Sequence, residues 1–386
     1  MSGSKKHVLV IGGAGYIGST LIRKLLANKA GYHVRLLDIL LYGEAPIADL
    51  YGHPRFELIQ GDFRDPTVVS YAMQDIDIVV HLGAIVGDPA CAIDEDLTIQ
   101  INLTATQTIA HAASEQRLPA VEGCGNPQPV GTRGNPQLVG GPGSRPVERF
   151  LFASTYSVYG ASQEIVDERS ALNPVSLYAH TKIDAENFLL SYPGEATFSP
   201  VVLRLSTVYG MSYRPRFDLV VNLLAARAAT EKHITIIEGD QWRSFVHVQD
   251  VANAFLLCIQ APLEKVRGQI FNVGSNDHNY RLCELGDLIR QAMPDVAITY
   301  QDRVEDRRNC QVRFDKIQHE LGFKPQRTLM DGILEVKQAI ESSAIADWRD
   351  KQYNNCRFLS EGEGLQRLHT DAKPPRTACQ AEKGKR

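Results

Sequence analysis

Three side chains near the middle of the chain have the types needed to oxidise an alcohol. Tyr178 and Lys182 are four positions apart in Tyr178-Ala179-His180-Thr181-Lys182, so on a helix they share one face. An ammonium group there would favour the phenolate and lower the pKa of Tyr178 from its ordinary value of about 10. Thr155 ends an apolar run, and its hydroxyl could bond the same substrate oxygen. Such a base suits hydride removal by a nicotinamide coenzyme.

Tyrosine and lysine at this spacing are common on exposed helices, so the interpretation depends on a coenzyme site. Glycines at positions 12, 13, 15 and 18 stand between an apolar run, residues 7–12, and a helical apolar periodicity. Glycine allows the sharp turn and the close approach of a pyrophosphate, and the helix N-terminus offers N–H groups to the phosphates. Asp38 ends the next apolar run, twenty residues after Gly18. A carboxylate there accepts ribose hydroxyls and repels a 2′-phosphate, which predicts NAD rather than NADP.

These motifs lie on an alternation of apolar runs and amphipathic segments. Further runs cover residues 33–38, 55–60, 77–82, 149–155 and 200–205. Such runs separated by helices are typical of a parallel sheet covered on both faces. We therefore expect an α/β fold, with a doubly wound parallel (Rossmann) sheet over residues 1–205. Residues 206–341 are expected to form mainly a smaller substrate-binding lobe, with some segments returning to the sheet.

Two segments do not fit this alternation. Residues 118–146 are rich in Gly, Pro, Asn and Gln and contain a near-repeat, GNPQPVG and GNPQLVG. Few apolar residues and many helix breakers predict a flexible surface insertion or, alternatively, a partner-binding loop. Residues 342–386 mix charges with two adjacent prolines and end in KGKR, which predicts a disordered tail.

Composition argues against several other classes of protein. A formal net charge of -4 disfavours binding to nucleic acid or to an anionic membrane. No signal peptide and no apolar run long enough to span a bilayer is recognised, so a soluble cytoplasmic protein is expected. The seven cysteines are scattered without a C-x-x-C pair. They predict reduced thiols, and neither a disulfide framework nor a metal site.

The motifs together resemble the extended short-chain dehydrogenase/reductase family, which contains NAD-dependent nucleotide-sugar epimerases and dehydratases. GGAGYIG resembles the family's coenzyme fingerprint, YAHTK its catalytic Tyr and Lys, and STYSVYG the segment that places its catalytic Ser or Thr on Thr155. The resemblance spans about residues 7–340 and implies a homodimer paired through helices around 102–115 and 178–191. The coenzyme contacts that it implies are made by Gly12, Gly15, Tyr16, Ile17, Gly18, Asp38, Asp62, Phe63, Leu82, Gly83, Ala84, Asn102, Tyr178 and Lys182.

Two of these positions need comment. Asp62 lies in a segment, GDFRD, that resembles the family's adenine-contacting motif. From its position alone it could equally cap the helix that begins near Asp65. Gly83 departs from the family's usual H-L-A-A, in which alanine stands at this place.

The resemblance also implies a nucleotide-diphosphate sugar as substrate, with a UDP-sugar favoured. Arg243 matches an arginine that binds the diphosphate, and Arg303 a second one in a motif like R-x-G-D, although the neighbouring Arg307 could serve instead. Two arginines can clamp a diphosphate through paired charged hydrogen bonds. Asn222 resembles a helix-borne asparagine that contacts substrate phosphate, and Thr207 stands where many members carry asparagine.

The residues after Thr155 favour one reaction of the family. Where 4,6-dehydratases have Asp-Glu, this chain has Tyr156 and Ser157, neither of which titrates near neutral pH when unperturbed. We therefore expect a 4-epimerase, which oxidises C4 and returns the hydride to the other face of the sugar. Two alternatives within the family stay open: a 4-dehydrogenase, and an atypical dehydratase that draws its acid and base from Cys91, Asp88 or His81. A third alternative is a non-catalytic NAD-binding scaffold, although such proteins typically lack the tyrosine or the lysine.

Overall fold

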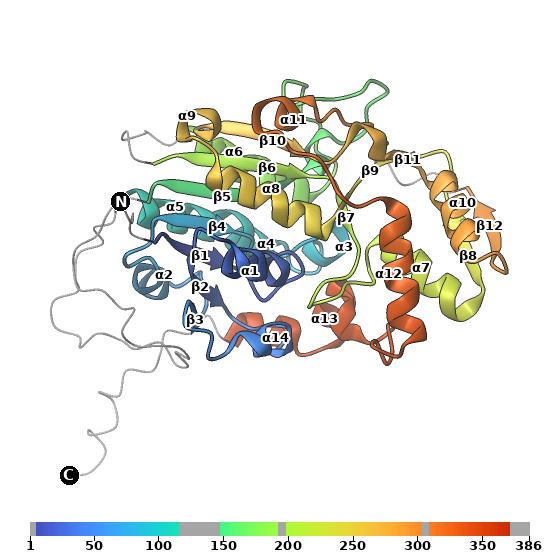
Figure 1. Cartoon of the computed structure of the whole chain (residues 1–386), viewed down its shortest axis with the longest axis horizontal. Coiled ribbons are helices and arrows are strands. Elements are labelled where there is room, and N and C mark those ends of the chain that lie inside the picture. The colour runs from blue at the N-terminus through green and yellow to red at the C-terminus, as the bar shows by residue number, and fades with distance from the viewer. Residues whose placement is uncertain (1–4, 116–146, 192–197, 303–308, 371–386) are drawn as a thin grey trace, which may run out of the picture.

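The computed structural model describes residues 5–115, 147–191, 198–302 and 309–370. The insertion expected at 118–146, Arg303 and Arg307, and residues 371–386 of the expected tail lie outside these ranges. The described residues form two lobes, a parallel sheet between two layers of helices and a smaller lobe beside it (Figure 1).

Seven parallel strands form the central sheet, in the order β10-β6-β5-β4-β1-β2-β3. Val10 of β1 pairs with Leu36 of β2 on one side and Val80 of β4 on the other. The chain thus winds outward from β1 in both directions, which leaves a crevice at the carboxyl ends of β1 and β4. The strands are β1 (His7–Ile11), β2 (His33–Asp38), β3 (Phe56–Gln60), β4 (Ile78–His81), β5 (Arg149–Thr155), β6 (Pro200–Leu205) and β10 (Gln269–Val273). This sheet confirms the doubly wound α/β fold.

Helices cover both faces because alternate strand residues are buried in two separate cores. Val10 belongs to one core and Ile11 to the other. On the first face lie α1 (Gly18–Ala27) and α8 (Val248–Gln260), which pack together. The second face is covered by α2 (Pro66–Ala72), α5 (Ala105–Glu115) and α6 (Leu177–Ser191). Shorter helices are α3 (Asp88–Cys91), α4 (Glu95–Ile99), a π-helical turn over Gln100–Thr104, α9 (Leu263–Val266) and α11 (Asp315–Leu321).

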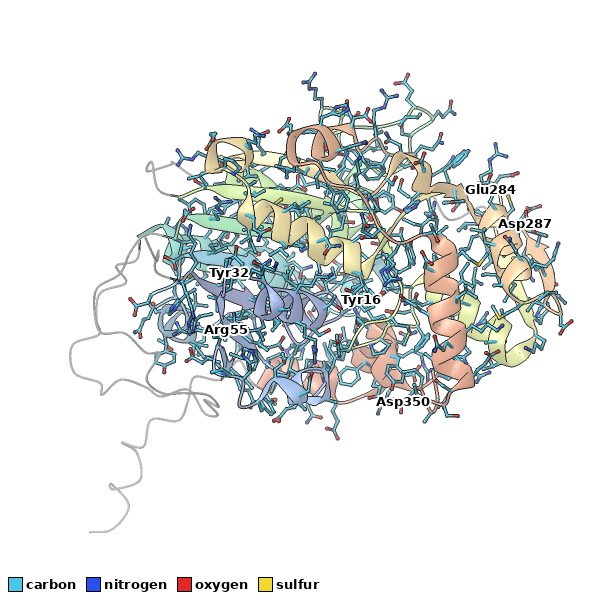
Figure 2. The ribbon with its side chains drawn as sticks, viewed as in Figure 1. Tyr16, Tyr32, Arg55, Glu284, Asp287 and Asp350 are labelled. Atoms are coloured by element: carbon cyan, nitrogen blue, oxygen red, sulfur yellow. The ribbon has the colours of Figure 1, made fainter. Side chains whose placement is uncertain are left out.

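The second lobe has its own apolar core. Two small sheets, β11-β9-β7 and β12-β8, contribute to it. Their strands are β7 (Thr207–Tyr209), β8 (His233–Ile237), β9 (Trp242–His247), β11 (Asn279–Arg281) and β12 (Ala297–Gln301), and the helices are α7 (Val220–Glu231), α10 (Leu282–Ala292) and α12 (Leu329–Glu341). Figure 2 shows Glu284 and Asp287 of α10 at the outer edge of this lobe and Tyr16 between the lobes. Two segments after residue 206 return to the first lobe, since β10 extends the central sheet and α8 packs on α1.

Residues 342–370 are ordered, so the prediction of a disordered tail is wrong for this part of the chain. They lead through a short helical turn, Lys351–Tyr353, into α13 (Asn355–Glu361) and α14 (Gly364–Thr370), which lie to the right of β3 and below β1 in Figure 1. Leu359 and Leu368 are buried in the core of the first lobe. Apolar residues three positions apart form one face of a helix. The prediction considered only the charges and prolines of this segment and missed that apolar pattern.

None of the described helices combines the length and apolar character required to cross a bilayer.

Candidate active site

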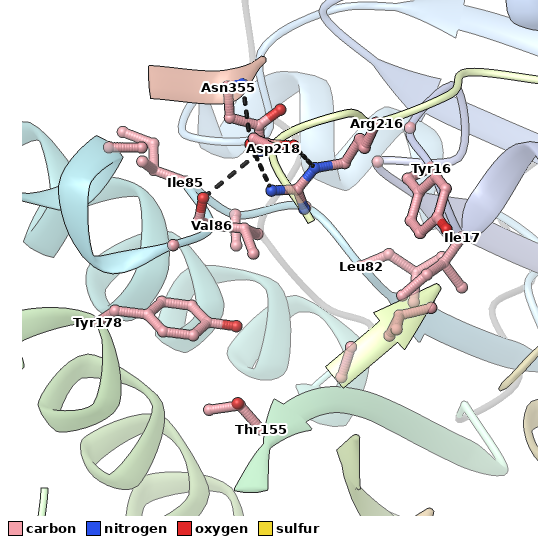
Figure 3. Close-up of a pocket in the computed structure, with 18 of the residues that line it drawn as sticks. Tyr16, Ile17, Leu82, Ile85, Val86, Thr155, Tyr178, Arg216, Asp218 and Asn355 are labelled. Atoms are coloured by element: carbon pink, nitrogen blue, oxygen red, sulfur yellow. Dashed lines mark hydrogen bonds and ion pairs between the residues drawn. The ribbon is translucent and has the colours of Figure 1, made fainter. Parts of the chain in front are cut away.

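A cavity of about 700 Å³ opens between the two lobes at the carboxyl ends of the central strands. Figure 3 shows Tyr16 and Ile17 on one side of it and Tyr178 and Thr155 on another. The sequence-predicted residues that line it are Gly12, Gly15, Tyr16, Ile17, Gly18, Asp38, Asp62, Phe63, Leu82, Gly83, Ala84, Thr155, Tyr178, Lys182, Thr207 and Arg243. The fold therefore brings residues from distant parts of the chain to one site.

The glycine turn after β1 forms the part of the cavity that fits a pyrophosphate. Gly12 has φ +77°, and a Cβ there would lie 2.6 Å from the Cα and N atoms of Gly83. Only glycine permits both this backbone conformation and this approach. The turn leads directly into the N-terminal end of α1, the part of a helix that favours anions.

Asp38, at the end of β2, is held in place by the backbone. Its Oδ2 accepts a hydrogen bond from the Ala14 amide at 2.9 Å, and its Oδ1 accepts one from the Leu40 amide at 2.8 Å. Burial raises the pKa of this carboxyl, and the two amides act in the opposite direction. A fixed carboxylate beside a glycine turn fits the ribose of a dinucleotide.

Asp65, and not Asp62, is the residue that caps α2. The Asp65 carboxylate accepts a hydrogen bond from the Thr67 amide and caps α2. Asp62 instead lines the cavity and accepts hydrogen bonds from the amide of Arg64 at 2.8 Å and from its guanidinium at 2.5 Å. Asp62 therefore does not cap α2, and its contact with the coenzyme stays a prediction.

The expected catalytic groups meet at the other end of the cavity. The Lys182 ammonium donates a hydrogen bond to the Ala153 carbonyl at 2.9 Å and lies 6.0 Å from the centroid of the Tyr178 ring. The Thr155 hydroxyl accepts a hydrogen bond from the Ser157 amide at 3.1 Å. Thr155 and Tyr178 lie on neighbouring sides of the same space in Figure 3. A substrate hydroxyl placed between them can be bonded by both.

The electrostatics of Tyr178 differ from the sequence-based prediction. Burial raises the pKa of its phenol above the ordinary value, and this effect outweighs the lowering by the Arg216 charge and by hydrogen bonding to Thr155. Burial also lowers the pKa of Lys182 to about 8. The predicted lowering of the Tyr178 pKa by Lys182 is therefore wrong for the protein alone, because dehydration dominates at both groups.

A buried polar network that the sequence patterns did not predict supports the catalytic end. The Arg204 guanidinium donates to the Glu186 carboxylate at 2.6 Å and to the Tyr159 hydroxyl at 2.9 Å. The Ser154 hydroxyl also donates to Glu186, and the Tyr159 hydroxyl donates to Asn272 at 2.8 Å. These bonds join β5, α6 and β6, the first two of which carry the expected catalytic residues.

Asn102 and Asn222 support the backbone near the cavity and are not among the residues that line it. The side-chain amide of Asn102 accepts a hydrogen bond from the backbone N–H of Ile85 at 2.8 Å and donates one to the Ile85 carbonyl at 3.0 Å. The side-chain amide of Asn222 accepts a hydrogen bond from the backbone N–H of Gly210 at 2.9 Å and donates one to the Arg216 carbonyl at 2.8 Å. Both side chains are thus bonded to backbone, and the coenzyme contact expected of Asn102 and the substrate contact expected of Asn222 stay predictions.

Two arginines of the second lobe that line the cavity were not identified from the sequence. Arg216 donates two hydrogen bonds to Asp218, at 2.9 and 2.8 Å, and Arg214 lies 3.6 Å above the Tyr42 ring (Figure 3 shows the Arg216–Asp218 pair). They come from the connection between β7 and α7 in the second lobe. The only signal was R-P-R-F-D at 214–218, which in a sequence is indistinguishable from exposed arginines.

Among the residues considered for an alternative acid or base, Asp88 lines the cavity, whereas Cys91 and His81 do not. The Cys91 thiol donates to the Ile85 carbonyl at 3.3 Å, and burial raises its pKa to about 12. Burial lowers the pKa of His81 to about 3. Asp88 accepts a hydrogen bond from the Ser176 hydroxyl at 2.7 Å.

Comparison with known proteins identifies the family. The model of the NAD dependent epimerase/dehydratase family matches residues 8–274. The chain belongs to this family. It is 28% identical to a dTDP-D-glucose 4,6-dehydratase of Bos taurus, over 91% of this chain and 90% of the relative. It is 25% identical to a UDP-glucose 4-epimerase of Lactobacillus helveticus, over 89% of this chain and 99% of the relative.

A solved 4-epimerase has the same fold. The UDP-glucuronic acid 4-epimerase from Bacillus cereus, in complex with UDP-glucuronic acid and NAD, superimposes with a TM-score of 0.71 at 25% identity, covering 87% of this chain and 99% of that chain. Family membership confirms an NAD-dependent enzyme. The glycine turn, α1 and Asp38 provide the features that an NAD site needs, so the residues present fit this coenzyme.

Proposed function

We propose that this epimerase/dehydratase is a 4-epimerase of a nucleotide-diphosphate sugar, with a UDP-sugar as substrate. The observation that carries the proposal is the pair Tyr156 and Ser157, at the place where 4,6-dehydratases have their acid and base. The Tyr156 hydroxyl is hydrogen-bonded to Thr207 at 3.0 Å, and the Ser157 hydroxyl accepts from Thr155 at 3.1 Å. Neither group is suited to eliminate water, which leaves oxidation and reduction at C4.

In this proposal the chain's residues bind the sugar nucleotide and move one proton. In its phenolate form Tyr178 removes the proton from the C4 hydroxyl while Thr155 holds the oxygen, and the resulting phenol returns the proton when the ketone is reduced. The glycine turn and Asp38 hold NAD, which when bound accepts a hydride from C4 and returns it. Arg243 is 7% exposed and lines the cavity from the second lobe, where a guanidinium can bind a diphosphate. Epimerisation needs no group beyond these, since the proton and the hydride both return to the sugar.

A dehydratase with an unusual acid or base is the second candidate. Asp88 lines the cavity, and its charge acts on Tyr178. The Asp88 carboxylate could remove a sugar proton, although it lies in a different part of the cavity wall from the segment that supplies the acid and base of 4,6-dehydratases. Substitution Asp88→Asn separates the candidates, because it would abolish dehydration and leave the groups proposed for epimerisation in place.

The test begins with protein that is denatured to measure released NAD. Native protein is then incubated with UDP-glucose or UDP-glucuronic acid, and the products are followed by NMR. Appearance of the 4-epimer supports the proposal, net NADH favours a 4-dehydrogenase, and a 4-keto-6-deoxy product favours the dehydratase. Tyr178→Phe is expected to reduce turnover by about 10²–10⁴-fold with NAD still bound. Tyr300→Phe, at a half-exposed position on β12, is the matched control.

A non-catalytic scaffold would behave differently in the same test. It would release NAD on denaturation but turn over no nucleotide sugar, and Tyr178→Phe would equal wild type in every assay. Pairing of two copies through the helices around 102–115 and 178–191 stays a prediction, which sedimentation of the purified protein can check.

A further inference from the structure

The segment that follows the second lobe forms a wall of the coenzyme site. Residues 354–370, here called the C-terminal strap, comprise Asn354, α13, α14 and the residues between them. Five of its side chains line the cavity: Asn354, Asn355, Cys356, Leu359 and Leu368. Leu359 is 3% and Leu368 5% exposed, so the strap is packed and not a loose terminus.

The strap is attached to the first lobe beside the two carboxylates expected to contact adenosine. The Arg367 guanidinium donates to the carbonyls of Leu41 at 3.0 Å and Leu40 at 3.2 Å, just after Asp38. The Arg64 guanidinium, which also holds Asp62, donates to the Leu368 carbonyl at 2.5 Å. These bonds place the strap over the adenosine end of the cavity.

The start of the strap is attached to the second lobe. The Asn355 amide donates to the Asp218 carboxylate at 3.0 Å, and the preceding Tyr353 carbonyl accepts from the Phe217 amide at 2.9 Å. The Asn355 side chain also donates to the Val86 carbonyl in the first lobe at 3.4 Å, as Figure 3 shows. The strap therefore joins both lobes across the site that lies between them.

We propose that the C-terminal strap is part of the NAD site and retains the coenzyme between turnovers. Coenzyme lying on Asp38 and Asp62 would have the strap against its adenosine half, and its release would require the contacts of Arg367 or Arg64 to open. A reaction that returns its hydride to the same sugar needs no exchange of coenzyme, so slow release of NAD does not slow its turnover. The inference depends on NAD binding and not on which sugar reacts.

The rate of NAD release from the full-length protein tests the strap. Holoenzyme is diluted into excess competing ADP-ribose, and NAD that remains bound is measured over time. Arg367→Ala removes two charge-assisted hydrogen bonds and is expected to speed release by about ten-fold or more. Arg367→Lys, which keeps one donor group, should recover part of the retention. Arg357→Ala is the matched control, because this exposed strap arginine pairs with Glu361 and the Arg349 carbonyl and does not line the cavity.

Amide exchange in the wild-type holoenzyme and coenzyme-free protein gives a second measurement that needs no variant. Removal of NAD should accelerate exchange in residues 355–370 and leave α11, which does not line the cavity, unchanged. Equal release rates for Arg367→Ala and Arg357→Ala, or strap exchange that is indifferent to NAD, would overturn the inference. A protein that binds no NAD at all would instead contradict the proposed function.

Discussion

Gly83 and Phe63 lie against each other in the wall of the cavity that is expected to hold NAD. A Cβ at Gly83 would lie 2.7 Å from Cε1 and 3.0 Å from Cζ of the Phe63 ring. Gly83 stands where the family resemblance has alanine, and in this chain the Phe63 ring leaves no room for a methyl group there. Substitution Gly83→Ala must therefore displace this ring, which packs on His81 at 5.8 Å between centroids.

Gly83→Ala is expected to weaken coenzyme binding rather than to lower the free energy of unfolding. Overpacking by one methyl group typically costs about 1–3 kcal/mol. Phe63 has packed core on one side and the cavity on the other, so the ring is displaced toward the space for NAD. If the whole cost falls on binding, the Kd for NAD rises about 5- to 140-fold. The free energy of unfolding of coenzyme-free protein should change little.

Calorimetric titration of coenzyme-free protein with NAD measures this effect, and urea denaturation measures folding. The double variant Gly83→Ala/Phe63→Leu has room for the new methyl group and should bind NAD more tightly than Gly83→Ala alone. The coupling between the two positions is expected to be about 0.5–3 kcal/mol. An unchanged Kd for Gly83→Ala, or a double variant that binds no better than the single one, would refute the steric explanation.

Three further predictions concern buried charge and coenzyme choice. Glu186→Gln leaves a buried arginine without its carboxylate and should lower the free energy of unfolding by about 3–5 kcal/mol. Glu231→Gln, which breaks a half-exposed ion pair, should lower it by less than about 1 kcal/mol, and urea denaturation measures both values. The pKa of His81 is about 3 in the fold against 6.5 as its ordinary value, so the unfolded chain binds the extra proton and stability falls as pH drops below about 6.5. Between pH 7 and pH 5 this group alone should lower the free energy of unfolding of the wild type by about 2 kcal/mol. His81→Gln lacks this contribution, so its free energy of unfolding should fall by about 2 kcal/mol less in the same urea titrations. Asp38→Ala should weaken NAD binding by about ten-fold and weaken NADP binding less, measured as the ratio of the two Kd values.

Local motifs predicted the fold and the coenzyme because each carries its own physical reason. The turn around Gly12 needs glycine, Asp38 must follow β2, and unalternating apolar runs must lie inside a covered sheet. All six strands expected in the first 205 residues are present, with ends that differ by one residue at most. These signals depend on a few neighbouring residues, and a single sequence shows them directly.

Features that depend on distant partners could not be predicted in this way. Nothing near Asn222 in the sequence shows that its amide is used by Gly210 and by the Arg216 carbonyl. The C-terminal strap was hidden for a similar reason, since Leu359 and Leu368 become recognisable only once the first lobe offers them a core. Charge and proline content describe the surface of such a segment and overlook its buried face.

Burial makes the Tyr178 phenol less acidic in the protein without coenzyme. In the protein alone, burial raises the pKa of the phenol, and the Lys182 ammonium is bonded to the Ala153 carbonyl. A further positive charge near a buried phenol opposes that effect, and the charge of Arg216 already acts in this direction. The oxidised nicotinamide ring carries such a charge, so bound NAD is expected to lower the pKa of the phenol that we propose as the base. A strap that retains NAD, as proposed above, would then also keep the pKa of Tyr178 lowered between turnovers.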